Sequence, residues 1–181
     1  DNIADIHRRD APSRATEISL GQARLETGAN VTLNVSVHDG SWDNVINQKQ
    51  IRPIVYTGDE GRQLVYEAGA VFRTSNGDSG IRVSDPPLVV SENRTFISVI
   101  GLNRPNQQAY SGSTVLIRAK NQRTSVAYSN TTNDVEKVKI GLRNTDQPGL
   151  WADYFEQSGF DPCTVSEEEV TCTYGPDSNI D

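Results

Sequence analysis

The sequence contains no methionine, only two cysteines and two histidines, and no long apolar run. Because a helix that crosses a bilayer needs about 20 predominantly apolar residues, the printed residues predict no membrane-spanning helix. The histidines, His7 and His38, lie far upstream of the cysteines and show no zinc-ligand spacing, so we expect no metal and no cofactor. The missing initiator methionine indicates a processed product or a fragment, and a cleaved signal peptide or a removed membrane helix would both fit.

Positive charge is absent from the C-terminal end. Residues 161–181 hold six acids and no Lys or Arg, so they contribute −6 of the net charge of −7 and leave −1 for residues 1–160. A nucleic-acid groove needs a basic stripe, which this balanced body does not offer. We therefore expect no nucleic-acid partner, and the charge gives equally little support for binding to anionic lipid.

Apolar and polar residues alternate along much of the chain. In residues 31–37 Val31, Leu33, Val35 and Val37 alternate with polar side chains, which predicts a strand buried on one face. About ten such short strands follow one another between Gly, Asn, Asp and Pro, whereas "GSWDNVINQKQ", residues 40–50, reads as a polar connection. No strand–helix alternation occurs, so we predict a mainly β protein, an antiparallel β-sandwich or rolled sheet.

The chain divides into three segments without a flexible linker. Residues 1–14 form an N-terminal segment, which reads either as the end of a helix that begins upstream or as a frayed terminus. Residues 15–146 form the antiparallel β domain. Residues 147–181 contain one short aromatic helix, a cysteine hairpin and the acidic tail.

The helix is predicted from "QPGLWADYFEQSGF", residues 147–160. Pro148 suits a first helical position and Gly159 a stop, while Trp151, Tyr154 and Phe155 recur at helical spacing. Because so short a helix is marginal alone, we expect these three aromatic side chains to pack over an open face or end of the sheet. The alternative is an exposed aromatic platform on which sugars stack.

Cys163 and Cys172 are nine residues apart, a spacing that suits a disulfide across a short hairpin; two reduced core thiols of a cytosolic protein are the alternative. Sequons for N-glycosylation occur at Asn30, Asn34, Asn93 and Asn130, and the alternation of residues 31–37 places Asn34 on the solvent face of its strand. Together, the disulfide and the sequons favour an extracellular glycoprotein.

No catalytic residue is assigned. His38 and Asp39 are adjacent in a strand and point to opposite faces, so Asp39 cannot readily orient the imidazole. Asp39, Ser41 and Asp43 match the first ligands of an EF-hand loop, but the sixth and twelfth positions are Asn44 and Gln50, and a surface loop is the better interpretation.

Three motifs carry a resemblance to a known family. They are "LVYEAGAVFR" at residues 64–73, "SDPPLVV" at residues 84–90 and "LWADYFEQSG" at residues 150–159. In this order the chain resembles secreted proteins of halophilic archaea that look like type IV pilins. That resemblance implies an N-terminal class III signal and one apolar helix, followed by a β-rich exterior domain that ends in a helix with a tryptophan and a Tyr-Phe-Glu triplet.

The resemblance implies a non-enzymatic structural domain of a pilin-like subunit, outside the cell or on its surface. Its partners would be like or related pilin-type subunits, and its only membrane contact a helix upstream of Asp1. A carbohydrate-binding or adhesive module is the first alternative, acting through exposed aromatics such as Trp42, Tyr110 or Tyr128. A secreted hydrolase with paired carboxylates is the second, because sequence does not reveal which acids meet across a cleft.

Overall fold

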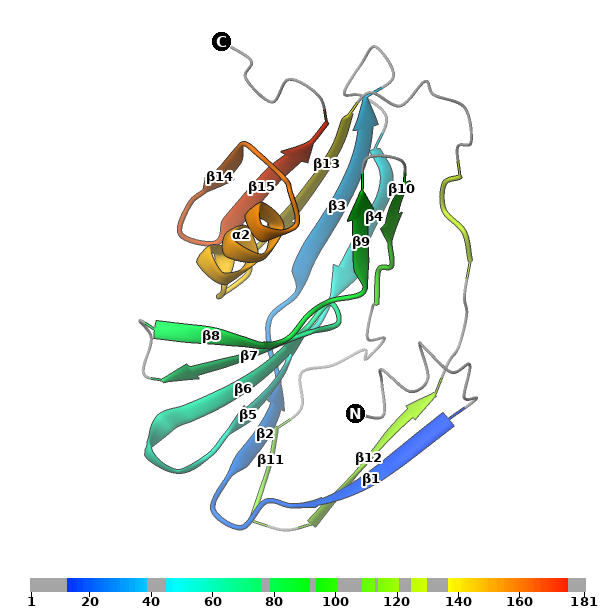
Figure 1. Ribbon diagram of the computed structural model, residues 1–181. Helices are drawn as coiled ribbons and strands as arrows, with labels where there is room; N and C mark the ends of the chain where they lie inside the picture. Colours follow the sequence, from blue (N-terminus) through cyan, green and yellow to red (C-terminus); the bar gives the residue numbers. More distant parts are fainter. Residues whose placement is uncertain are drawn as a thin grey trace.

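The protein is mainly β and carries one short helix near its C-terminus (Figure 1). The computed structural model describes residues 13–38, 45–75, 79–91, 94–100, 109–112, 114–120, 125–129 and 137–175. Within these ranges every strand pair is antiparallel, which confirms the predicted fold class.

The larger sheet has six strands, and Figure 1 shows it in the lower part of the molecule. In spatial order its strands are β11 (Ala109–Ser111), β2 (Arg24–Thr27), β5 (Ile54–Thr57), β6 (Arg62–Glu67), β7 (Ala70–Ser75) and β8 (Ser79–Ser84). The short 3₁₀ turn η1 (Asp59–Gly61) joins β5 to β6.

The second sheet has five strands. They are β14 (Cys163–Val165), β15 (Glu169–Tyr174), β13 (Lys137–Arg143), β3 (Val31–His38) and β4 (Val45–Ile51). Along β3 buried and half-buried side chains alternate, with Val31, Leu33, Val35 and Val37 in the core, as the sequence predicts.

The two sheets are joined at a corner, where two stretches of the chain pass from one sheet into the other. β2 leads into β3 and β4 leads into β5, so one bent hairpin contributes two strands to each sheet. At the corner the Gly28 N–H donates to the Pro53 carbonyl at 2.9 Å. Proline cannot donate to a ladder, which suits Pro53 to the break between β4 and β5. The architecture is therefore a rolled antiparallel sheet whose halves face each other across the core.

The turn between β6 and β7 depends on glycine. Ala68 has φ +49° and Gly69 φ +96°, and Glu67 pairs with Ala70 across this two-residue turn. Positive φ at both central positions is the geometry of a type I′ hairpin. A Cβ atom at Gly69 would also lie 2.6 Å from Cδ of Pro87, so no larger residue fits there.

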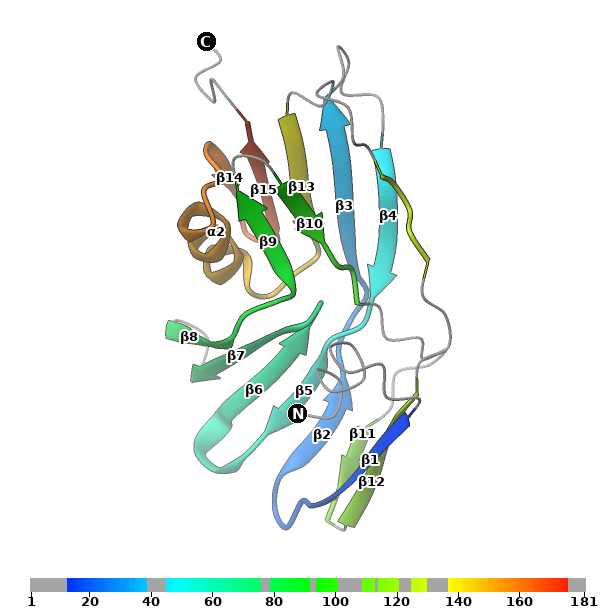
Figure 2. The same cartoon turned by 45° about the vertical axis from the view of Figure 1, so that its right-hand side comes forward.

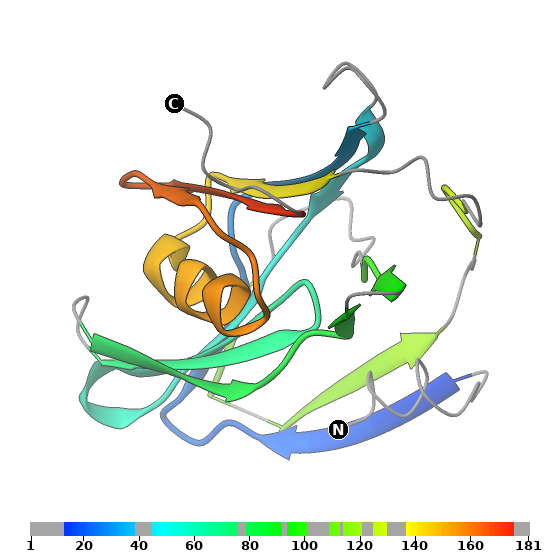
Figure 3. The ribbon, with the colours of Figure 1, turned by 45° about the horizontal axis from the view of Figure 1, so that its top comes forward.

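The helix α2 (Pro148–Gln157) lies between the two sheets (Figure 3). Pro148 occupies the first turn, as predicted, and Gln147 is the N-cap. Gly159, at φ +88°, ends the helix, and the Phe160 N–H donates to the Phe155 carbonyl at 2.9 Å.

Two short ribbons complete the described structure. β9 (Leu88–Ser91) pairs with β10 (Arg94–Ile97), and β1 (Ser13–Ser19) pairs with β12 (Thr114–Lys120). The β9–β10 ribbon stands beside α2, over the inner side of the five-stranded sheet (Figure 2). Leu88 and Ile97 pack against the core from this ribbon.

The number of strands and one connection differ from expectation. Fifteen strands occur within the described residues, compared with about ten predicted. The turn at residues 20–23 and Pro53 each divide one expected strand into two. The interpretation of residues 40–50 as a polar connection is wrong for residues 45–50, which belong to β4 (Val45–Ile51) at the edge of the five-stranded sheet. Its residues 48–50 are polar and exposed, a composition that is common on edge strands because it discourages pairing with other chains.

Candidate functional site

The predicted aromatic residues form a continuous buried cluster between the sheets. Trp151 stacks on Phe155 with ring centroids 5.5 Å apart and meets Phe72 of β7 edge-on at 5.3 Å. Phe155 contacts Phe160, and Phe160 contacts Tyr174 of β15, both at 5.5 Å. Since Trp151 is 2% and Phe155 1% exposed, the alternative of an exposed helical platform for sugars is wrong. The cluster joins the six-stranded sheet to the five-stranded sheet through α2.

A buried carboxyl group lies at the centre of this junction. Glu67, at the end of β6, is 2% exposed and accepts hydrogen bonds on Oε1 from Nε1 of Trp151 at 2.6 Å and from Oγ1 of Thr145 at 2.8 Å. The Gln147 N–H donates to Oγ1 of Thr145 at 3.1 Å, which links the carboxyl to the start of the helix. Glu67 therefore fixes the position of α2.

Burial raises the pKa of Glu67 to about 7, because the charged form loses its hydration. The bonds from Thr145 and Trp151 lower the pKa, and the negative charge of Asp146 raises it. The sequence analysis missed this residue, although the sequence contains a signal for it. Side chains alternate along β6, so Glu67 points to the same buried side of the sheet as Val65, two residues before it. An acid at an inward position predicts either a partner network or a functional group.

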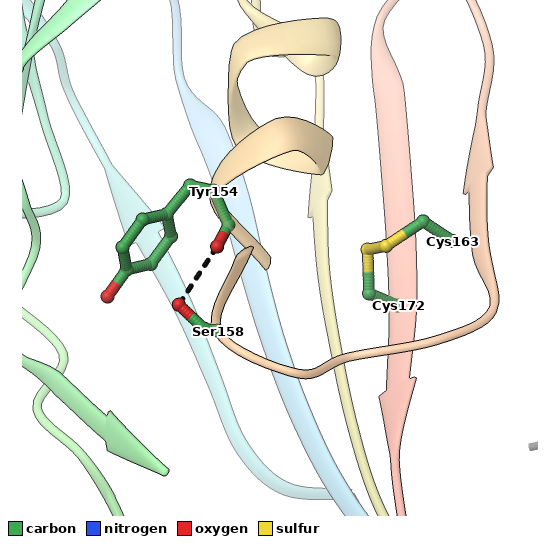
Figure 4. Close-up of a disulfide and its surroundings, with 4 residues drawn as sticks. All are labelled: Tyr154, Ser158, Cys163 and Cys172. Atoms are coloured by element: carbon green, nitrogen blue, oxygen red, sulfur yellow. Dashed lines mark hydrogen bonds between the residues drawn. A yellow bond between two sulfur atoms is a disulfide. The ribbon is translucent and has the colours of Figure 1, made fainter. Parts of the chain in front are cut away.

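The cysteines form a disulfide between β14 and β15, with Cα atoms 4.1 Å apart (Figure 4). Cys163 and Cys172 are also directly paired in the strand ladder. The helix end lies beside this hairpin, where Oγ of Ser158 donates to the Tyr154 carbonyl at 2.9 Å. The disulfide thus fixes the hairpin against which the aromatic cluster packs.

The outer face of the five-stranded sheet is polar. One cross-strand row contains Gln48, Asn34, Gly141 and Thr171 and so spans four adjacent strands. Asn34 is half-buried at the middle of this row, and its neighbour Gly141 has no side chain. Asn30 is exposed at the corner, where its Nδ2 donates to Oε1 of Gln50 at 3.4 Å. Two of the four predicted sequons therefore lie on or beside one polar face, while Asn93 and Asn130 lie outside the described residues.

The outer face of the six-stranded sheet is different. A cross-strand row joins Leu25, Tyr56, Leu64, Arg73 and Ile81 across five strands. Leu64 and Ile81 are exposed although apolar, as is Val83 beside them. Around Tyr56 the surface is hollowed into an open depression. Its lining residues are Tyr56, Gly58, Asp59, Glu60, Arg62, Gln63, Leu64, Arg73 and Val83.

A second exposed apolar feature lies on the β9–β10 ribbon. Val89 and Phe96 are directly opposite each other in the register and are 56% and 50% exposed. Leu88 and Ile97 face the core from the same ribbon, so Val89 and Phe96 form its outward side. A paired aromatic and β-branched residue on an outer face is suited to contact another apolar surface.

The other candidate residues are scattered. Tyr110 and Tyr128 are 41% and 39% exposed, and Trp42 lies outside the described residues. His38 is half-buried at the end of β3, whereas the three EF-hand candidates lie outside the described residues. Among the described residues, no group of three or more His, Cys, Asp and Glu could hold a metal ion. The depression contains two acids, Asp59 and Glu60, which are sequence neighbours on an open surface.

Comparison with known proteins assigns the chain to a family. A family described as "Family of unknown function (DUF7289)" matches residues 1–180. No curated protein and no solved structure is significantly similar to the chain. No helix in the described part of the chain has the length and apolar character that crossing a membrane requires.

Proposed function

The chain belongs to the DUF7289 family, and we propose that it is a non-enzymatic structural domain of a pilin-like subunit, displayed outside the cell or on its surface. Its partners in this proposal are like or related subunits. Membrane attachment is assigned to an apolar helix upstream of Asp1, as the resemblance to haloarchaeal pilin-like proteins implies. The carbohydrate-binding function is the second candidate, and the open depression around Tyr56 favours it.

The disulfide supports an extracellular location. Disulfides persist in secreted and surface proteins and are rare in a reducing cytosol. Here Cys163 and Cys172 fix the hairpin that covers the helix end, so oxidation contributes directly to the packing of α2. The role of the disulfide is structural, as expected for a domain that must remain folded outside the cell.

The division of the outer surface is the observation that carries the proposal. The five-stranded sheet turns a polar face outward, with Asn34 at its centre, whereas the β9–β10 ribbon exposes the apolar pair Val89 and Phe96. We assign the polar face to solvent and glycan. We assign the apolar pair to contact with a neighbouring subunit, because isolated apolar ribbons are costly to leave in water.

Amine-reactive crosslinking of the natively produced protein tests this assignment. Phe96→Asp should remove crosslinked oligomers, since it places a charge in the proposed contact. Leu116→Asp is the matched control, because Leu116 is 56% exposed, close to the 50% of Phe96, but lies on the β1–β12 ribbon. Crosslinking unchanged by Phe96→Asp, or lost equally in both variants, would contradict the proposed contact.

A further inference from the structure

We propose that the depression around Tyr56, between the β5–β6 turn and the strands β7 and β8, is a binding site for a neutral saccharide. This site rests on the carbohydrate-binding function, the second candidate above, and does not depend on the pilin-like function or on the β9–β10 contact. It lies on the outer face of the six-stranded sheet and uses a tyrosine that the sequence analysis did not select.

The centre of the depression is apolar. Tyr56 and Leu64 are directly paired across β5 and β6, and Val83 contributes from β8. An aromatic ring carries a negative π face, which attracts the slightly positive C–H groups of a pyranose ring. Leu64 and Val83 are exposed, so they can cover the rest of an apolar sugar face.

Gly58 keeps space beside the tyrosine ring. A Cβ atom at this position would lie 3.5 Å from Cε1 of Tyr56, so any larger side chain would contact the ring. The backbone of Gly58 is extended, with φ −89° and ψ −166°, which other residues adopt readily. The glycine is therefore not required by conformation, and what it provides is open space on one side of the half-buried Tyr56 ring.

The rim of the depression carries polar groups of both signs. Asp59 and Glu60 oppose Arg62 and Arg73, so the formal charges cancel. Carboxylates accept hydrogen bonds from sugar hydroxyls, and guanidinium groups donate to them. A charge-balanced rim favours a neutral ligand rich in hydroxyl groups over a phosphate or an acidic polymer, which would need an excess of positive charge.

Two features of the rim are suited to binding a ligand: the ordered turn between β5 and β6, and the side chain of Arg73. Glu60 has φ +62°, a left-handed conformation that is uncommon for a residue with a side chain, and it forms an ion pair with Arg62. The Gly58 N–H closes this turn by donating to the Arg62 carbonyl at 2.8 Å. Arg73 is exposed at the rim, where its guanidinium group can donate hydrogen bonds to a ligand.

The experiment is a titration of the ¹⁵N-labelled full chain, followed by amide shifts in NMR spectra. The probes are methyl glycosides of glucose, galactose, mannose and N-acetylglucosamine, with glucuronate and inorganic phosphate as anionic probes. We expect saturable shifts at residues 56–64 with at least one neutral glycoside and none with the anions. Tyr56→Ala should raise Kd at least about tenfold, which corresponds to about 1.4 kcal/mol.

Two further variants test whether binding uses the Tyr56 ring and the charged rim. Gly58→Leu should block binding by covering the ring, and Arg73→Gln should weaken binding while leaving the packed core untouched. Tyr110→Ala is the control, because Tyr110 is a tyrosine of the same sheet that is 41% exposed but does not line the depression. No shift with any neutral glycoside, binding of the anions alone, or equal losses in the Tyr56 and Tyr110 variants would overturn the proposal. None of these outcomes bears on the crosslinking of Phe96 variants, so the two proposals fail separately.

Discussion

The most informative perturbation of this fold is Glu67→Gln, which removes a charge from the junction of sheet and helix. Glu67 is buried, and its pKa is raised from 4.5 to about 7. Native protein therefore binds a proton more tightly than unfolded protein does. The free energy of unfolding should be greatest below about pH 4.5 and should decrease as pH rises towards about 7.

The magnitude follows from the raised pKa. Because one pKa unit is worth 1.36 kcal/mol, ionised Glu67 costs the folded state about 3 kcal/mol at pH 8 relative to acid pH. Both donors, Nε1 of Trp151 and Oγ1 of Thr145, bind Oε1, so a glutamine oxygen can accept the same two bonds. The side-chain NH₂ group of the glutamine has no acceptor among these partners, and burying it costs about 1 kcal/mol. We therefore expect Glu67→Gln to raise the free energy of unfolding by about 2 kcal/mol at pH 8.

Chemical denaturation at pH 4, 6 and 8 measures this effect. The wild-type protein should lose stability across the series, while Glu67→Gln should remain nearly constant and lie about 1 kcal/mol below the wild type at pH 4, because the cost of its amide group does not depend on pH. Glu156→Gln is the control, since Glu156 is an exposed acid on the same helix and its loss should change stability by less than about 0.5 kcal/mol. Asp146→Asn should move the wild-type decrease to lower pH, because Asp146 raises the pKa of Glu67. A wild-type stability that increases with pH, or a Gln variant less stable than the wild type at pH 8, would refute the reasoning.

Three other predictions test the helix, the hairpin and the polar face. Phe155→Ala should reduce the free energy of unfolding by about 3 to 5 kcal/mol, because Phe155 is buried and contacts three other rings; a loss below about 1 kcal/mol by circular dichroism would contradict this packing. Replacing both Cys163 and Cys172 by serine should cost about 2 to 3 kcal/mol in thermal or chemical unfolding, and wild-type protein in reductant should show the same loss. Asn34→Gln should remove one glycan mass from natively produced protein, and an unchanged intact mass would show that the site is unmodified.

The sequence predicted the elements that are determined by residues close together in the chain. The strict alternation of residues 31–37 is sufficient to define a strand with one buried face, and β3 follows it. The helix was equally readable, because Pro148 and Gly159 bound a helical spacing of aromatic residues. The nine-residue spacing of the cysteines likewise indicated the hairpin in which they are bonded.

Features that depend on distant pairing were not readable. β4 is a strand because β3 lies beside it, and its polar residues 48–50 carry no alternation of their own. The corner needs Gly28 and Pro53 to meet, although they are far apart in the sequence. Tyr56 and Arg73 line the same depression only after β5, β6 and β7 have paired in the sheet. The fold class was therefore predictable, whereas the candidate site required the tertiary structure.

The central claim, an exterior structural domain, is tested most directly by labelling intact cells with a membrane-impermeant amine reagent. Lys49 and Lys120 are exposed in the described structure and provide the peptides to read by mass spectrometry. Our account predicts that both lysines are modified on intact cells, to the same extent as after permeabilisation. Modification that appears only after permeabilisation would place the domain inside the cell and contradict the account.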